Sequence, residues 1–293
     1  MGTGALSSRA PWRPPGEDES VERVRFGPFL TREVVKRPDG SRLVYSSRRQ
    51  RKGLPPQVEG AAAPAHRRVI WAPRELGWWV AVLFMVGSFC FALGAVPGFS
   101  SVVSPGVVGL VFFVGSIFFT SAGYSQFVQS INAGRPPGTP VRLFAVQPRR
   151  IDWWACAIQS VGTLWFNVNT FAAMRTGFST QQELLRVWTP DFVGSICFLV
   201  ASELAIMEVC HAWFSWRDRD VSWWIVVLNM VGSIFFMISA LAAFVVPDTG
   251  DLLDESLANS GTFLGAVCFF WGARLLLDEL ASSDEALAAG PQT

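Results

Sequence analysis

The stretch WWIVVLNMVGSIFF at 223–236 decides how this chain folds, because its pattern occurs three times. In each copy a pair of tryptophans precedes a Val-Gly dipeptide, and the second tryptophan lies eight residues before the glycine. The other two copies are WWVAVLFMVGSFCF at 78–91 and WWACAIQSVGTLWF at 153–166. Self-similarity at a fixed spacing indicates a repeated structural unit.

The second half of this pattern also occurs three times without the tryptophans. A Gly-[Ser/Thr/Ala]-x-[Cys/Phe/Trp]-Phe core is therefore present six times, and its glycines are Gly87, Gly115, Gly162, Gly194, Gly232 and Gly265. Small residues let helix backbones approach closely in lipid, where apolar burial does little to drive helices together. We interpret the six glycines as a helix-packing motif and a helical hairpin as the repeating unit.

Six long apolar stretches surround these cores, near 77–97, 106–128, 152–174, 189–210, 221–246 and 258–280. Each has about 20 residues or more, the length that an α-helix needs to cross about 30 Å of hydrocarbon. The alternative, six buried helices of a large soluble protein, fits poorly with short connections flanked by tryptophan. We predict an all-α membrane bundle of six spans, built from three parallel hairpin repeats at 77–128, 152–210 and 221–280.

The composition of the whole chain agrees with a membrane protein. Its 293 residues are 51% hydrophobic and 16% charged, with a mean hydropathy of +0.34. A soluble domain carries about 25% charged residues, so this chain has too few charges to cover a surface that faces water. The net charge of +1 argues against a strongly basic nucleic-acid-binding protein. We therefore expect the lipid bilayer as a partner and no nucleic acid.

The basic residues predict an orientation in the membrane. Of the 24 Lys and Arg residues, 22 lie on the side of the N-terminal segment and two on the other side of the predicted spans. Short cytoplasmic loops carry the excess of Lys and Arg. We predict that both termini are cytoplasmic and that the protein is a multi-pass protein of the plasma or cell membrane.

The segment before the first span divides into two parts. We predict a disordered arm at 1–32, a short basic cytoplasmic segment at 33–76 and, after the transmembrane domain at 77–280, a cytoplasmic tail at 281–293. Two β-prone runs around Pro38-Asp39-Gly40 predict a β-hairpin over 33–45, which needs another surface to lean on. The basic run RRQRK at 48–52 either binds acidic lipid headgroups or only fixes the topology.

Ionisable residues inside a span are candidates for function. Nine residues after the glycine, the even-numbered spans carry Tyr124, Glu203 and Arg274. Nine residues turn a helix by about 900°, so these three face away from the glycines. We predict an ion pair between Glu203 and Arg274 that joins two repeats, with Tyr124 bonded nearby. A substrate or ion site and snorkelling to the headgroups are the alternatives. Gln159 and Asn229, three residues before their glycines, are expected to form interhelical hydrogen bonds.

Motifs of known chemistry are missing from the sequence. The five cysteines form no C-x-x-C pair, His66 and His211 lie far apart, and the chain has no glycine-rich phosphate loop, nucleophile elbow or H-E-x-x-H motif. We expect no enzyme activity, no cofactor and no metal site.

The paired apolar helices with a Gly-Ser-[Ile/Phe]-x-Phe core and a short basic arm ahead resemble the YrhK domain family of small integral membrane proteins. The resemblance covers residues 77–280 as repeated pairs and implies a membrane location, without an established biochemical role. The leading hypothesis is a multi-pass membrane protein with a structural or partner-binding role. It would form a homo-oligomer or bind a cytoplasmic partner through its N-terminal arm. The rival hypothesis is a transporter or channel for a small solute or ion that uses a polar cluster around Glu203.

Overall fold

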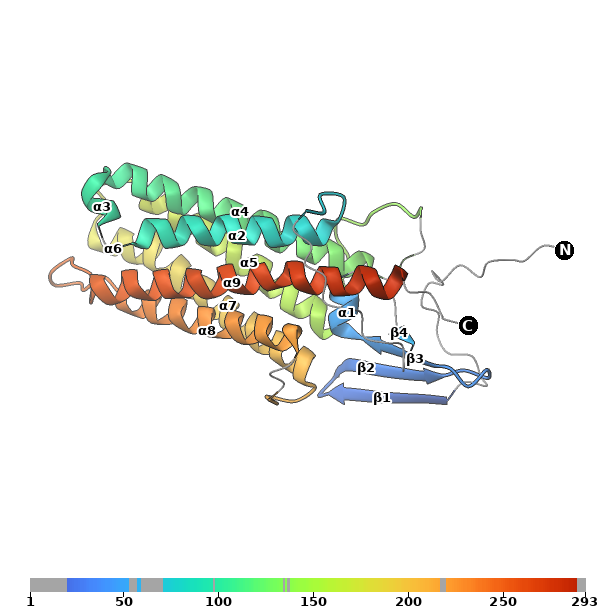
Figure 1. Cartoon of the computed structure of the whole chain (residues 1–293). Helices are drawn as coiled ribbons and strands as arrows, with labels where there is room; N and C mark the ends of the chain where they lie inside the picture. The colour runs from blue at the N-terminus through green and yellow to red at the C-terminus, as the bar shows by residue number, and fades with distance from the viewer. Residues whose placement is uncertain are drawn as a thin grey trace.

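The computed structural model describes residues 20–52, 57–58, 71–96, 98–133, 135, 138–216 and 220–288, with side chains described up to residue 280. Six long helices run side by side, and a small β-sheet lies at one end of them (Figure 1). Each begins within three residues of the start of one of the six predicted apolar stretches. The long helices are α2 (Leu76–Ala95), α4 (Pro105–Asn132), α5 (Ile151–Ala173), α7 (Thr189–Cys210), α8 (Val221–Ala242) and α9 (Glu255–Ala288).

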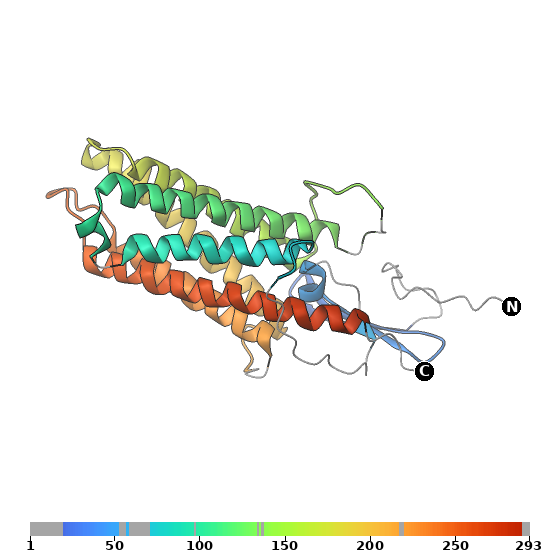
Figure 2. The ribbon, with the colours of Figure 1, turned by 45° about the horizontal axis from the view of Figure 1, so that its top comes forward.

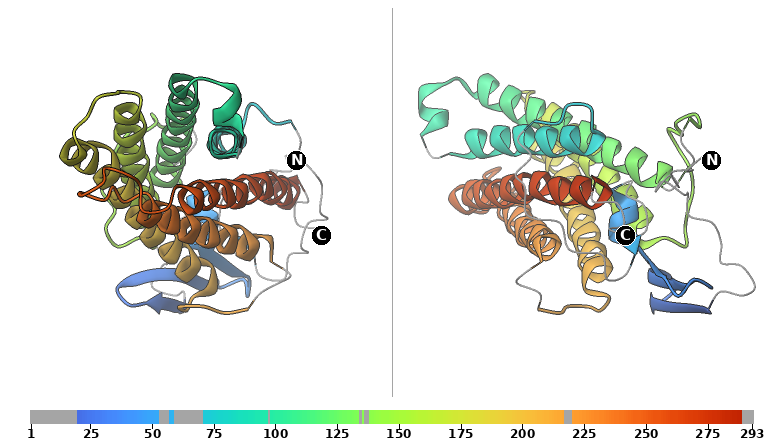
Figure 3. Two further views of the ribbon diagram at one scale, coloured as in Figure 1. Left: turned by 90° about the vertical axis from the view of Figure 1, so that its left-hand side faces the viewer. Right: turned by 45° about the vertical axis from the view of Figure 1, so that its right-hand side comes forward.

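The long helices form a closed ring. Each one packs against the next long helix along the chain, and α9 packs against α2. Figure 3 (left) shows this arrangement from the end opposite the sheet. Because the order in space follows the order in the chain, short connections suffice between neighbours. The buried faces of all six helices therefore surround one central axis.

Several of the long helices have the length and composition of membrane spans. Five helical segments, at 76–95, 105–132, 180–210, 221–242 and 255–280, are long and apolar enough to cross a membrane. The sixth long helix, α5, has 23 residues but carries Asp152, Gln159, Asn167 and Asn169. Apolar helices of this length are consistent with a multi-pass membrane protein.

Short helical turns connect the long helices at the end opposite the sheet (Figure 2). The turn α3 (Phe99–Val102) joins α2 to α4, and α6 (Thr180–Glu183) and the π-helix η1 (Leu184–Trp188) lead directly into α7. A capping box between Ser179 and Gln182 begins α6, because each side chain accepts from the other residue's backbone N–H. These turns let the chain reverse direction between adjacent helices.

The N-terminal part of the described chain is an antiparallel sheet of four strands in the order β1-β2-β3-β4. The strands are β1 (Ser20–Phe26), β2 (Phe29–Lys36), β3 (Arg42–Ser46) and the two-residue β4 (Gln57–Val58). Lys36 pairs with Arg42, so the predicted hairpin around Pro38-Asp39-Gly40 is confirmed. In its turn, Asp39 Oδ1 accepts hydrogen bonds from the hydroxyl and the backbone N–H of Ser41, at 2.6 and 2.8 Å.

The predicted disorder of residues 1–32 is wrong for residues 20–32, which form β1 and the first half of β2. The prediction rested on a polar composition, whereas the order comes from contacts made further along the chain. β1 pairs with β2, and β2 buries Thr31, Val34 and Val35. Residues 1–19 lie outside the described chain. At the other end, α9 continues to residue 288, well into the predicted tail at 281–293.

A short helix, α1 (Ser47–Arg51), joins the sheet to the bundle. It packs against α4, α5 and α7, and β2 packs against α5. The ring of Phe26 in β1 meets the ring of Trp213 edge-on, with 5.3 Å between centroids. We call this end, where α2, α5 and α8 begin and α4, α7 and α9 finish, the sheet end of the bundle.

Candidate functional site at the sheet end of the bundle

The repeat glycines lie where the two helices of a hairpin approach most closely. A Cβ atom added to Gly87 would lie 3.0 Å from the carbonyl oxygen of Gly115, and one added to Gly115 would lie 3.2 Å from that of Gly87. The same approach brings Gly162 to Gly194 and Gly232 to Gly265. Backbones that come this close leave no room for a side chain, which is the reason for glycine at these positions.

The phenylalanine four residues after each glycine fills the centre of the bundle. On α2, α5 and α8 the three ring centroids lie 5.8 to 6.3 Å apart, and on α4, α7 and α9 they lie 5.6 to 6.3 Å apart. Within each hairpin the two rings lie 5.1 to 5.4 Å apart. All six are at most 7% exposed. They are Phe91, Phe119, Phe166, Phe198, Phe236 and Phe269. Two connected sets of three rings therefore fill the middle of the bundle.

Buried hydroxyl groups link neighbouring hairpins. Ser116 Oγ of α4 and Thr170 Oγ1 of α5 are hydrogen bonded at 2.9 Å. Ser202 Oγ of α7 and Ser233 Oγ of α8 are hydrogen bonded at 2.8 Å. Ser116 and Ser233 directly follow repeat glycines. The hydroxyl side chain at the second position of the repeat core is thus small enough for the close helix contact and also forms a hydrogen bond to the adjacent hairpin.

The tryptophan pairs fasten the connections at the sheet end. The first tryptophan of each pair is buried, and the indole N–H groups of Trp153 and Trp223 donate to the carbonyl oxygens of Ala145 and Ser215, both at 2.8 Å. In both cases the acceptor lies eight residues earlier in the chain. These two hydrogen bonds therefore hold the preceding loop against the start of α5 and of α8.

The predicted ion pair between Glu203 and Arg274 is wrong. Arg274 Nη1 instead donates to Asp278, one turn further along α9, at 2.9 Å. Glu203 is partly exposed and makes no hydrogen bond or ion pair with the residues that the structure describes. The hydroxyl of Tyr124 donates to the carbonyl oxygen of Leu143, outside the bundle core. Nine residues are two and a half helical turns, so the three side chains lie on the face opposite the glycines and point outward. They therefore cannot meet across the central axis.

The two predicted amides take part in inward contacts. Gln159 Oε1 of α5 accepts a hydrogen bond from Arg51 Nη2 at 3.3 Å. Asn229 of α8 lies against Gly272 of α9, where an added Cβ would be 2.7 Å from its Oδ1. The interaction of Gln159 is with α1, whereas a bond between two spans was expected.

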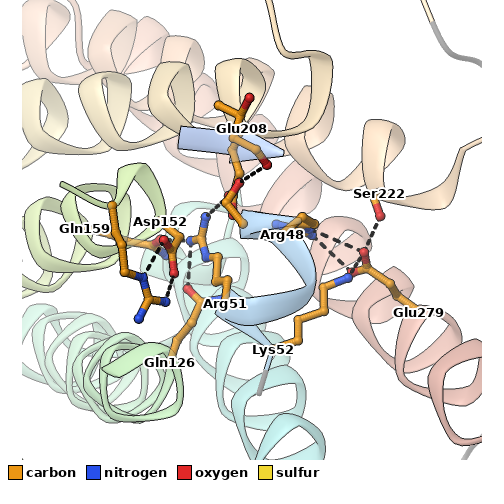
Figure 4. Close-up of polar contacts among 12 residues, drawn as sticks. Arg48, Arg51, Lys52, Gln126, Asp152, Gln159, Glu208, Ser222 and Glu279 are labelled. Carbon is orange, nitrogen blue, oxygen red and sulfur yellow. Dashed lines mark hydrogen bonds and ion pairs between the residues drawn. The ribbon is translucent and has the colours of Figure 1, made fainter. Parts of the chain in front are cut away.

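A cluster of buried charges lies at the sheet end, where α1 enters the bundle (Figure 4). Arg51 Nη1 forms a 3.3 Å ion pair with Glu208 of α7, and its Nη2 donates to Gln126 of α4 at 3.1 Å. Arg51 and Glu208 are 5% and 0% exposed. Because Gln159 of α5 also accepts from Nη2, the two terminal nitrogens of one planar guanidinium join α4, α5 and α7, which a single lysine ammonium could not do with the same fixed geometry.

A second buried carboxylate, that of Glu279, lies on α9. Glu279 accepts from Arg48 Nη2 at 3.1 Å and also contacts the ammonium group of Lys52 and the hydroxyl of Ser222 on α8. Arg48 and Glu279 are 9% and 7% exposed. Burial lowers the pKa of Arg48 to about 10. The carboxylate of Glu279 compensates the charge that burial would otherwise disfavour.

A third buried carboxylate lies at the start of α5. Asp152 is fully buried and accepts a 3.1 Å hydrogen bond from Arg150 Nε. Arg150 Nη2 also donates to the carbonyl oxygen of Ser130 in α4, at 3.0 Å. Nearby, burial raises the pKa of the Tyr45 hydroxyl in β3. The sheet end is therefore held by three separate carboxylates, each facing a guanidinium.

Sequence reasoning missed the carboxylates of this cluster, although the repeat contains a signal for them. Gln129, Glu208 and Glu279 each lie 14 residues after a repeat glycine. Fourteen residues turn a helix by about 1400°, close to four full turns, so these side chains return to the glycine face. All three bind the α1 region, since Gln129 Nε2 donates to the carbonyl oxygen of Lys52 at 2.9 Å. The equivalent positions of three hairpins thus converge on one short helix.

No protein-family profile, curated protein or solved structure matches this chain.

Proposed function

We propose that the chain is a six-span integral membrane protein with a structural or partner-binding role, which holds a β-sheet module at the cytoplasmic face of a closed bundle. α5 is the sixth span. Its 23 residues reach about 34 Å at 1.5 Å per residue. Gln159 bonds Arg51 and Asn169 Nδ2 donates to the carbonyl oxygen of Val187, so these polar groups are paired within the protein, as a lipid environment requires.

The three hairpins are repeats arranged about a pseudo-threefold axis. The glycine pairs within hairpins, the two sets of three phenylalanines and the convergence of three equivalent positions on α1 all support this arrangement. Each hairpin enters and leaves at the sheet end, so all three have the same direction. Membership of the YrhK domain family stays a prediction from the repeat motif.

The sheet end faces the cytoplasm. The chain before α2, the α4–α5 and α7–α8 connections and α9 contain 22 of the 24 Lys and Arg residues, and positive charge in short loops favours the cytoplasmic side. The opposite end carries Asp248, Asp251 and Asp254 in one loop and Glu255 at the start of α9. Both termini are then cytoplasmic, and the sheet is presented to cytoplasmic partners.

The filled centre of the bundle is the observation that favours a structural role over transport. Six phenylalanine rings close the axis at mid-depth, and α1 lies across the sheet end, where Arg48 pairs with Glu279 and Arg51 pairs with Glu208. A conducting protein needs a polar path past both layers. Glu203, the residue that the transport hypothesis requires, lies outside the cluster and outside the bundle core.

Flux measurements test this proposal. The purified full-length chain in liposomes should pass small cations, protons and chloride no faster than protein-free liposomes do. The Glu203→Gln variant should behave in the same way. Flux above the background that disappears in the Glu203→Gln variant would overturn the proposal and establish the transport hypothesis.

A further inference from the structure

A pocket opens beside α1 at the sheet end, between α2, α4 and α9. It is a small space, part of which is open to solvent. Its polar wall consists of Arg48, Arg51, Lys52, Gln126, Gln129 and Glu279. Val80, Leu276 and Leu280 supply an apolar side. The pocket therefore combines charged groups with a surface that suits hydrocarbon.

The wall of this pocket carries an excess of positive charge. Among the residues that the structure describes, three cationic side chains and one carboxylate line it, and that carboxylate, Glu279, is shared between Arg48 and Lys52. Glu208 pairs with Arg51 without lining the pocket. Asp220, near Arg48, accepts a hydrogen bond from the backbone N–H of Ser222 at the start of α8. An anion in the pocket would find cations that the protein compensates only in part.

Arg51 also has an unused hydrogen-bond donor. Its two terminal nitrogens bind Glu208, Gln126 and Gln159, but its Nε–H has no partner among the described residues, although the side chain is only 5% exposed. A buried donor without an acceptor is unfavourable by itself. Burial and the neighbouring Arg48 also hold the pKa of Lys52 well below its usual value. A bound anion would relieve both conditions.

The N-terminus of α2 forms another part of the wall. Gly77, the second residue of this 20-residue helix, lines the pocket and has no side chain to fill it. Backbone N–H groups and the helix dipole at an N-terminus favour phosphate and other anions. The first turn of α2 therefore borders the same pocket that Arg51 and Lys52 line.

We propose that this pocket binds a phosphate group. Guanidinium, ammonium and amide donors around one space with a helix N-terminus are the donor set that phosphate oxygens accept from. The phosphate belongs either to an anionic lipid headgroup, whose acyl chains would pass along Leu276 and Leu280, or to a small soluble molecule. The site is independent of the membrane topology proposed above.

Thermal unfolding of the full-length chain tests the site with two probes, the first in detergent and the second in nanodiscs. The first is inorganic phosphate, compared with sodium chloride at equal ionic strength. The second is phosphatidic acid in nanodiscs of phosphatidylcholine, compared with phosphatidylcholine alone. At least one probe should raise the unfolding temperature of the parent chain. A response to inorganic phosphate would show that a soluble phosphate is enough to occupy the pocket. A response to phosphatidic acid alone would show that the ligand is a lipid headgroup.

Two variants locate the response. Lys52→Gln removes a cation from the wall. Gly77→Ala adds a methyl group 3.3 Å from Leu280 Cδ1 and 3.4 Å from Gln129 Nε2, without changing any charge. Lys52→Gln should weaken the apparent affinity by about tenfold or more, the size expected for one charge-assisted contact. Gly77→Ala should also weaken it, because the added methyl group crowds the wall of the pocket. Lys36→Gln, an exposed position in β2, should leave it unchanged.

Two results would overturn the proposal. One is the absence of a response to both probes in the parent chain. The other is a response of equal size in the parent, Gly77→Ala and Lys36→Gln chains, which would indicate general electrostatic stabilisation. If Lys52→Gln fails to fold because Glu279 loses a partner, Gly77→Ala still decides the question.

Discussion

Arg51 and Glu208 lie 157 positions apart in the chain and form a 3.3 Å ion pair at the sheet end of the bundle. Both side chains are almost fully buried, and the same guanidinium also binds amides from α4 and α5. Buried charge pairs therefore help to fix the β-sheet module to the bundle. Such pairs are sensitive to the loss of one partner, because the other partner then stays buried without compensation.

Glu208→Gln should therefore destabilise the protein strongly. Removing one partner of a buried ion pair costs about 3–5 kcal/mol, and here Arg51 would be left facing a neutral amide. The matched control is Glu203→Gln on the same helix, where the carboxylate is partly exposed and has no described partner, so little change is expected. Chemical unfolding in detergent, followed by tryptophan fluorescence, compares the two. Equal stabilities of the two variants would contradict the role of Glu208.

The positions of the long helices were predictable from sequence, because 20-residue apolar stretches leave few alternatives. The repeat core was equally informative, since six glycines in register specify which helix faces approach. The charged site was harder to predict. Glu203 and Arg274 stand out within their spans because their neighbours are apolar, yet they face outward. Glu208 and Glu279 lie near the ends of apolar helices, where a carboxylate is common and attracts less attention.

The order of residues 20–32 also depends on contacts that the local sequence does not reveal. Arg23 in β1 forms a 2.8 Å ion pair with Glu33 in β2, and Ser47 donates to the carbonyl oxygen of Thr31. Strand pairs of this kind are marginal until another surface covers them. Part of the covering surface is α5, which begins at this end of the bundle and lies more than 100 residues away in the chain.

Cysteine labelling should place the two ends of the bundle on opposite sides of the membrane. Arg135→Cys lies in the connection at the sheet end, and Asp251→Cys lies in the loop before α9 at the other end. In intact cells an impermeant maleimide should label Asp251→Cys and should label Arg135→Cys only after lysis. The five native cysteines lie in helices and are buried or partly buried, so the parent chain measures the background. Labelling of both positions in intact cells would contradict the six-span topology.

The turn of the β2–β3 hairpin should show a pH response at Asp39. The hydroxyl and backbone N–H of Ser41 hold the pKa of this carboxyl below its usual value of 3.8. The contribution of these bonds is present above pH 3.8 and is lost as the pH falls through the folded-state pKa. Ser41→Ala should move the pKa part of the way back, since the backbone donor remains. Carboxyl NMR titration of labelled aspartate measures both values, and an unchanged pKa in the variant would exclude the hydroxyl as a cause.

Gly115→Ala should destabilise the first hairpin. The added Cβ would lie 2.8 Å from Cys90 Cβ and 2.9 Å from the ring of Phe91, so α2 and α4 would have to separate. Overpacking of this kind costs about 1–3 kcal/mol in soluble cores. Gly106→Ala on the same helix is the control, because nothing lies within 4 Å of its added Cβ. Thermal unfolding in detergent should distinguish them, and a Gly115→Ala chain as stable as the control would show that the glycines do not limit the approach of the helices.

Phe91→Ala should destabilise the whole bundle, because Phe91 contacts rings from three other helices. Its ring centroid lies 5.4 Å from that of Phe119 on α4, 6.3 Å from that of Phe166 on α5 and 6.0 Å from that of Phe236 on α8. Phe91 therefore contacts one helix of each of the three hairpins besides its own helix, α2. Truncating a buried phenylalanine costs about 3–5 kcal/mol.

Phe89→Ala is the matched control for this change, since the side chain lies two residues away on α2 and is 59% exposed. It removes the same number of atoms and should leave the unfolding free energy nearly unchanged. The same pair of variants also addresses the closed centre of the bundle. If Phe91→Ala remains folded, its liposomes should gain little ion leak, because the five remaining phenylalanine rings still close the axis. A leak that rises sharply in Phe91→Ala and not in Phe89→Ala would show that this single ring acts as a gate, and it would favour the transport hypothesis over the structural one.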